Sequence, residues 1–141
     1  MACCRATGDV LEVAIGTGRN LPFYPPHVRL TAIEFSPAML DIARKRAANP
    51  GRQIAAVDLR LGDAQALDLP DAAFDTVICT LSLCGIPDER RAIREMKRVL
   101  RPGGQLILLD TSLPRRPGPA RFSGSSSSFD TTRFTNGVIL Q

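Results

Sequence analysis

The sequence predicts an α/β protein with a doubly wound, mostly parallel sheet of about five strands. Short apolar runs alternate with segments in which apolar residues recur at helical spacing, which is typical of βαβ units. Residues 10–14 are apolar except for Glu12, as expected for a strand that helices cover on both faces. A length of 141 residues fits one domain.

The first half of the chain predicts two strands and one helix. Residues 10–14 and 29–34 read as the strands, and the prolines between them leave room only for a short or irregular helix. Ser36 is a candidate N-cap, and Pro37 suits the first helical position. We expect this helix to end at the Asn-Pro-Gly of residues 49–51.

The second half predicts three more strands, at residues 57–61, 74–79 and 105–110. Between the last two, Asp88 can cap a helix, and Arg91 and Glu95 are expected to pair one turn apart on its outer face. The "RPGG" motif after this helix should stop it. Its buried face is expected to consist of Ile93, Met96 and Leu100.

The composition changes after Asp110, where proline, arginine and serine replace the periodic apolar pattern. We therefore expect a folded domain at residues 1–110 and a mostly disordered tail at residues 111–141. Within this tail, only the final "FTNGVILQ" has the composition of a turn followed by a short strand.

Charge and cysteine content exclude several classes of protein. The net charge is +4, but residues 1–110 hold 14 Lys and Arg against 13 Asp and Glu, so we expect no nucleic-acid partner. The four cysteines lack the spacing of a zinc site, which predicts reduced thiols and no metal. No apolar run is long enough for a membrane span and no signal peptide is evident, so a cytoplasmic location is expected.

The stretch "VLEVAIGTGRN" at residues 10–20 predicts a ligand-binding turn after the first strand. It differs from the dinucleotide fingerprint G-x-G-x-x-G, because Leu21 stands where the third glycine belongs. Instead, Glu12, Ala14, Gly16 and Gly18 place an acidic residue and three small residues at every second position. A binding site for NAD is therefore disfavoured.

Two carboxylates are expected beside this turn, because parallel strands present their carboxyl ends at one edge of the sheet. Glu34 ends the second strand roughly 20 residues past the loop, the spacing of a residue that accepts ribose hydroxyls. Asp63 follows the third strand and can accept the amino group of an adenine. Together they predict a nucleoside site without a phosphate cradle.

Four ordered motifs, "VLEVAIGTGRN", "AIEFSPAML", "LGDAQALDLPDAAFDTVIC" and "MKRVLRPGGQLILLD", resemble the class I S-adenosylmethionine-dependent methyltransferases, in particular the type-11 methyltransferase domains. The resemblance extends from about Asp9 to Asp110. It implies a Rossmann-like fold, S-adenosylmethionine as cofactor, and methyl transfer to a small-molecule acceptor with a thiol, amine or hydroxyl group.

The resemblance also implies which residues bind the cofactor. The glycine loop would contact its methionine part, Glu34 its ribose, the residues after Glu34 and around Asp63 its adenine, and the end of the fourth strand the region beside the sulfonium. The full set is Glu12, Ala14, Gly16, Gly18, Asn20, Glu34, Phe35, Ser36, Met39, Asp63, Ala64, Thr80 and Leu81. The sequence nominates no catalytic residue, since His27, Cys79 and Cys84 fit structural roles better.

Members of this family normally carry a helical segment before the first strand, and a helix with two antiparallel strands after the fifth. We therefore expect a chain truncated at both ends, with a native or frame-shifted tail. The fifth strand would then have an unpaired edge, through which two copies could form a homodimer. The alternative function is a catalytically silent module that binds the cofactor or a partner.

Overall fold

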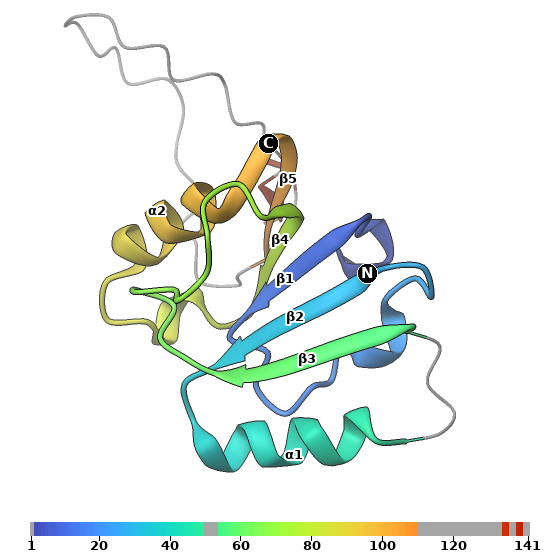
Figure 1. Ribbon diagram of the computed structural model, residues 1–141. Coiled ribbons are helices and arrows are strands. Elements are labelled where there is room, and N and C mark those ends of the chain that lie inside the picture. The colour runs from blue at the N-terminus through green and yellow to red at the C-terminus, as the bar shows by residue number, and fades with distance from the viewer. Residues whose placement is uncertain (1, 50–53, 110–133, 136–137, 140–141) are drawn as a thin grey trace, which may run out of the picture.

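The computed structural model describes residues 2–49, 54–109, 134–135 and 138–139 (Figure 1). Its strands form one sheet in the order β3-β2-β1-β4-β5-β7-β6. The first five strands are parallel, and the last two add antiparallel to the edge of β5. Their bounds are β1 Asp9–Val13, β2 Arg29–Glu34, β3 Ala56–Leu61, β4 Phe74–Thr80, β5 Leu100–Leu109, β6 Phe134–Thr135 and β7 Val138–Ile139.

Two α-helices join these strands, α1 at Pro37–Ala47 and α2 at Glu89–Val99. Both predicted N-caps are confirmed, since the Met39 N–H donates to Ser36 Oγ and the Arg91 N–H donates to Asp88 Oδ1. Three short 3₁₀ helices complete the elements, η1 at Ala2–Arg5, η2 at Leu21–Phe23 and η3 at Leu83–Gly85. In the described part of the chain, no helix has both the length and the apolar character to cross a bilayer.

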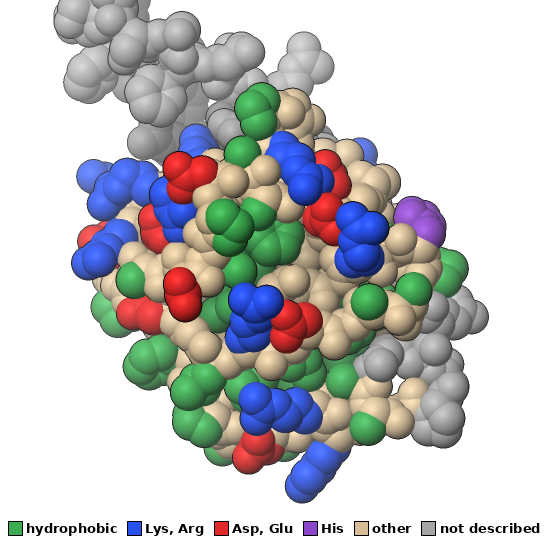
Figure 2. Space-filling view, viewed as in Figure 1, with side chains coloured by type: hydrophobic (Ala, Val, Ile, Leu, Met, Phe, Trp, Pro, Cys, Tyr) green, Lys and Arg blue, Asp and Glu red, His purple; other side chains and the backbone are tan. Residues whose placement is uncertain are grey.

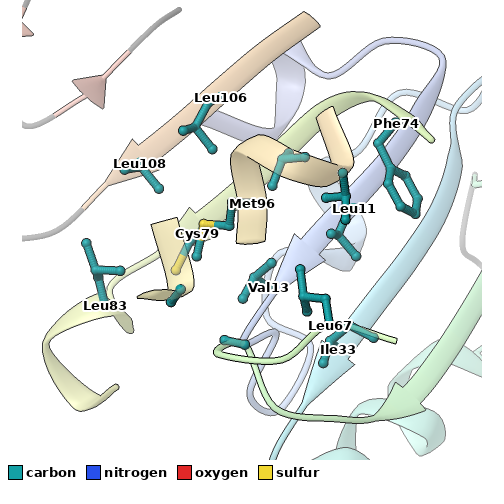
Figure 3. Packing of buried hydrophobic residues seen from close by; sticks show 14 residues of the cluster. Leu11, Val13, Ile33, Leu67, Phe74, Cys79, Leu83, Met96, Leu106 and Leu108 are labelled. Carbon is teal, nitrogen blue, oxygen red and sulfur yellow. The ribbon is translucent and has the colours of Figure 1, made fainter. Parts of the chain in front are cut away.

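Apolar side chains fill both faces of the sheet. On one face, α2 packs against β1, β4 and β5. Figure 3 shows Met96 of α2 among strand residues such as Val13 and Leu106. On the other face, η1, η2 and part of α1 cover side chains of the same strands, among them Val10 and Ile107. These two layers confirm the doubly wound arrangement. Acidic and basic side chains are interspersed on the surface that Figure 2 shows.

The packing of α2 differs from the prediction. Its buried residues are Ala92, Met96 and Val99, while Ile93 is half-buried and Leu100 belongs to β5. The expected pair of Arg91 and Glu95 is also wrong, because Glu95 instead bonds to Arg98 at 2.9 Å. Arg98 also contacts Asp71 and two carbonyl groups before β4, which draws Glu95 toward that side of the helix.

The fifth strand is longer than predicted and its edge is not open throughout. It begins at Leu100, so the "RPGG" motif ends the helix but lies within the strand. Leu108 and Leu109 pair with β7, which corrects the expectation of an unpaired edge at these positions. The strand β7 bears out the short strand expected in "FTNGVILQ", and β6 before it was not expected. The predicted disorder of the remaining tail falls outside the described residues.

Candidate functional site

The site lies where the order of the strands reverses. In the sheet, β2 and β3 lie on one side of β1, and β4 and β5 lie on the other, so the carboxyl ends of β1 and β4 border a crevice. A pocket of about 580 Å³ opens there. Its volume falls in the range of roughly 300–1,000 Å³ that is typical of small-molecule sites.

The pocket brings together most of the predicted cofactor residues. Those that line it are Ala14, Gly16, Glu34, Phe35, Ser36, Met39, Asp63, Ala64 and Leu81. The four that lie outside its lining are Glu12, Gly18, Asn20 and Thr80. Sequence reasoning missed further lining residues, namely Ile33, Gly62, Gln65, Ser82, Cys84, Gly85, Ile86 and Pro87.

The two glycines of the loop have different structural roles. Both have positive φ, 61° at Gly16 and 78° at Gly18, which favours glycine. A Cβ atom added to Gly16 would meet no atom within 4 Å, so the pocket side of this residue is open. At Gly18 the added atom would lie 2.9 Å from Leu21 Cδ1 and 3.2 Å from Ala43 Cα. Gly18 therefore permits close packing of the loop against α1, whereas Gly16 leaves room for a ligand.

Side chains from two other elements hold the loop in place. Glu34 at the end of β2 accepts the Gly16 N–H through Oε2 at 2.8 Å. Arg46 of α1 donates to the carbonyl oxygen of Thr17 at 2.8 Å and to its hydroxyl at 2.7 Å. The loop conformation is thus fixed by the protein before any ligand binds.

Glu34 is the central polar group of the pocket and is only 7% exposed. Its second oxygen, Oε1, accepts the Ser36 N–H at 2.9 Å. A carboxylate offers about four acceptor positions, and the two backbone donors use two of them. The remaining acceptor positions are available to hydroxyl groups of a ligand.

Apolar side chains form the walls beside Glu34. Phe35 is 73% exposed and Met39 is also exposed, although both are large and apolar. Across the pocket, Leu81 is 59% exposed and has φ of 54°, a rare conformation for leucine. Such exposed apolar surface suits a flat aromatic ligand.

Asp63 occupies the third wall, at the end of β3. Its Oδ1 accepts the backbone N–H of Gln65 at 2.8 Å and the side-chain amide of the same residue at 3.1 Å. These two hydrogen bonds, the backbone one first, lower the pKa of Asp63, so the carboxylate is ionised at neutral pH. It can therefore accept a hydrogen bond from an amino group.

The segment between β4 and α2 forms the part of the lining that sequence reasoning missed. Ser82 places its hydroxyl 2.9 Å from the Thr80 carbonyl oxygen and 3.3 Å from that of Ala14, which links the ends of β4 and β1. Cys84 is exposed and lies on the same segment. The motif "LSLCGIP" does not predict that these residues line a pocket, because its short 3₁₀ helix leaves no periodic pattern in the sequence.

Glu12, Asn20 and Thr80 form a hydrogen-bonded cluster behind the glycine loop, together with Tyr24. The amide nitrogen of Asn20 donates to Glu12 Oε1 at 2.7 Å and to Thr80 Oγ1 at 2.8 Å, and the Tyr24 hydroxyl donates to Glu12 Oε2 at 2.8 Å. Glu12 is only 1% exposed, and this burial raises its pKa to about 7. Sequence reasoning missed Tyr24, which lies within the proline-rich segment between Pro22 and Pro25.

Comparison with known proteins places this geometry in a family. A family model described as a methyltransferase domain matches residues 11–108. The chain is 40% identical over 112 residues to the phosphatidylethanolamine N-methyltransferase of Cereibacter sphaeroides, covering 79% of this chain and 54% of that relative. It is also 40% identical over 108 residues to the demethylmenaquinone methyltransferase of Deinococcus radiodurans, covering 74% and 44% respectively. The chain thus spans about half the length of these curated relatives.

Solved structures agree with this assignment. The YcgJ protein from Bacillus subtilis has a TM-score of 0.69 at 31% identity and covers 77% of this chain, which corresponds to 46% of its own. An S-adenosylmethionine-dependent methyltransferase from Thermotoga maritima has a TM-score of 0.58 at 33% identity, covering 72% and 43%. These structures confirm the predicted Rossmann-like fold. Because the family model matches more than half of the sequence, this chain belongs to the type-11 methyltransferase domain family.

Proposed function

We propose that this chain binds S-adenosylmethionine in the 580 Å³ pocket and transfers the methyl group to a small-molecule acceptor. Membership of the methyltransferase family makes S-adenosylmethionine the expected cofactor. The observation that carries the proposal is the carboxylate of Glu34, which two backbone N–H groups orient at the wall of the pocket.

The described residues fit a nucleoside. The free acceptor positions of Glu34 suit the two hydroxyls of a ribose, which are both donors. Phe35 and Met39 supply apolar surface for an adenine, and Asp63 supplies an acceptor for its amino group. Ser36, Ala64 and Leu81 complete this part of the lining. Ala14 and Gly16 would lie against the rest of the cofactor.

S-adenosylmethionine supplies a sulfonium methyl group that a nucleophile of the acceptor can attack in line. The residues of the chain contribute orientation and exclusion of water, since the walls are mostly apolar. Of the described lining residues, the carboxylates of Glu34 and Asp63 are the ones that this proposal assigns to the ribose and the adenine, so neither is left to deprotonate an acceptor. An amine or thiol acceptor, which needs no strong general base, is therefore favoured over a hydroxyl.

A second candidate is a silent module that binds the cofactor and transfers no methyl group. The activities named for the two curated relatives stay proposals for this chain, which covers 54% and 44% of their lengths. The names of these relatives suggest acceptors to test, phosphatidylethanolamine and demethylmenaquinone. Methyl transfer to either acceptor, or to a panel of thiols and amines, would establish the enzyme, whereas binding without transfer would favour the module.

Calorimetric titration with S-adenosylhomocysteine tests the site itself, with NAD as a comparison ligand. We expect the thioether nucleoside to bind, NAD not to bind, and Glu34→Ala to lose binding. Asp41→Ala is the matched control, because it removes an exposed carboxylate of α1 that lies outside the pocket lining. No binding by the folded wild-type chain would contradict the proposal.

Two further expectations stay predictions. The cytoplasmic location rests on the sequence pattern. A homodimer would have to use the part of the β5 edge that β7 does not pair with, before Leu108. Sedimentation at increasing protein concentration tests whether this homodimer forms.

A further inference from the structure

The hydrogen-bonded cluster behind the glycine loop connects three separate segments of the chain. Glu12 belongs to β1, Asn20 follows the glycine loop, and Thr80 ends β4. None of these three residues lines the pocket, although the sequence predicts all of them as cofactor contacts. Their contribution to the site therefore needs another explanation.

The hydrogen bonds of the cluster leave Asn20 no freedom to reorient. Its side-chain NH₂ group has two hydrogens, and two acceptors, Glu12 Oε1 and Thr80 Oγ1, lie within 2.8 Å of its nitrogen. The Tyr24 hydroxyl donates to the other oxygen of Glu12, so that carboxylate is fixed as well. The glycine loop runs between Glu12 and Asn20, and both of its ends are thus tied to buried groups.

This brace determines the position of the loop relative to the neighbouring strands. Thr80 is held in the sheet by pairing with Leu109 of β5, so the position of its hydroxyl is set by the sheet. The hydrogen bond from Asn20 to Thr80 holds the end of the loop against β4. The same loop donates the Gly16 N–H to Glu34 Oε2. A shift of the loop would therefore break the hydrogen bond from Gly16 and move the carboxylate of Glu34, which the proposed function assigns to the ribose.

We propose that Glu12, Asn20 and Thr80 are positioning residues, which keep the glycine loop in register with Glu34 and do not themselves touch the ligand. This inference rests on the proposed function for its ligand. It also predicts how fast the Gly16 N–H exchanges its hydrogen, which can be measured without any ligand.

Substitutions on β4 provide a matched test. Thr80→Val removes the acceptor of Asn20 and keeps the shape of the side chain. Thr76→Val is the control, because Thr76 lies on the same strand and its hydroxyl bonds to the backbone of Thr7 near the other end of β4. We expect both variants to lower the melting temperature, but only Thr80→Val to weaken binding of S-adenosylhomocysteine, by roughly tenfold. Thr80→Ser, which keeps the hydroxyl, should restore binding.

A double-mutant cycle separates positioning from direct contact. If Thr80 acts through Asn20, then Asn20→Ala and the double variant Asn20→Ala/Thr80→Val should bind the ligand equally weakly. Additive losses of affinity would show that Thr80 contacts the ligand itself, and would overturn the proposal. Equal losses in the Thr76→Val and Thr80→Val variants would also overturn it.

Amide hydrogen exchange tests the brace in the absence of ligand. We expect faster exchange of the Gly16 N–H in Thr80→Val than in Thr76→Val, because only the first variant releases the loop. Equal exchange in the two variants would refute the brace even if the wild-type chain bound no nucleoside. Failure of the wild type to bind S-adenosylhomocysteine, with the exchange difference intact, would instead refute the proposed function.

Discussion

The two ends of the parallel sheet hold their carboxylates in different ways. At the amino end, Asp9 and Asp75 pair with the guanidinium groups of Arg29 and Arg101, at N–O distances of 2.6 to 3.1 Å. The hydrogen bond from Arg29 is the main cause that lowers the pKa of Asp9, and the one from Arg101 does the same for Asp75. These charges are neutralised within the protein.

At the carboxyl end, the buried carboxylates have only neutral donors among the described residues. Glu34 accepts two backbone N–H groups, and Glu12 accepts an amide and a phenol hydroxyl. Burial without a cationic partner raises the pKa of Glu12 to about 7. The difference indicates that the carboxylates of the amino end stabilise the sheet, whereas at the carboxyl end Glu34 keeps acceptor positions for a ligand.

The largest expected effect is a pH dependence of stability that comes from Glu12. Its pKa rises from the ordinary 4.5 to about 7 on folding, so its stabilising contribution is complete below pH 4.5 and is lost as the pH rises through 7. The unfolding free energy of the wild type, relative to Glu12→Gln, should fall by roughly 3 kcal/mol across this window, at about 1.36 kcal/mol per pKa unit. Urea unfolding at a series of pH values measures this difference.

The amino end should respond in the opposite direction. Because the pKa of Asp9 is lowered, its contribution is present above its ordinary value of 3.8 and is lost as the pH falls below it. Asp9→Asn should therefore be less stable than wild type at neutral pH, and this difference should shrink as the pH falls below 3.8. Parallel curves for wild type and Glu12→Gln would mean that Glu12 titrates near its ordinary pKa.

The second effect is on ligand affinity. In Glu34→Gln one oxygen becomes an NH₂ group, which must face the N–H of either Gly16 or Ser36, and the negative charge is lost. We expect binding of S-adenosylhomocysteine to weaken roughly a hundredfold, about 2.7 kcal/mol. Asp75→Asn makes the same chemical change at the amino end and should lower stability by about 1 kcal/mol with affinity within about twofold of wild type. A similar loss of affinity in both variants would remove the distinction between the two ends.

The third comparison concerns the two loop glycines. Alanine at either position meets the strain of positive φ, which costs about 1 kcal/mol. In Gly18→Ala, contacts at 2.9 and 3.2 Å add overpacking against Leu21 and Ala43, so stability should fall by about 1 kcal/mol more than in Gly16→Ala. Gly16→Ala should instead show the greater loss of ligand affinity, since its methyl group faces the pocket. Melting curves with and without S-adenosylhomocysteine separate the two outcomes.

Local signals explain why much of this fold was predictable. The five parallel strands are apolar or alternating runs over most of their length, and both N-caps are short motifs, so neighbouring residues suffice to identify them. The choice of side-chain partner depends instead on distances across the fold. Nothing near Tyr24 in sequence indicates that its hydroxyl reaches Glu12. Helical spacing allows either Arg91 or Arg98 to pair with Glu95, and the contacts of Arg98 with the segment before β4 favour Arg98. The site at the strand ends was therefore predictable, but the brace behind it was not.

The smallest effect is expected at Ala14, which lines the pocket and has positive φ although it is not glycine. Ala14 has φ of 57°, and Ala72, outside the pocket lining, has φ of 50°. Glycine relieves the backbone strain at either position but adds freedom to the unfolded chain, so both variants should stay within about 0.5 kcal/mol of wild-type stability. Only Ala14→Gly removes a methyl group from the pocket, so only this variant should bind S-adenosylhomocysteine more tightly, by roughly threefold or about 0.65 kcal/mol. Unchanged affinity would mean that the methyl group of Ala14 does not face the bound ligand. Ala14 would then be no more important for binding than Ala72, which lies outside the pocket lining.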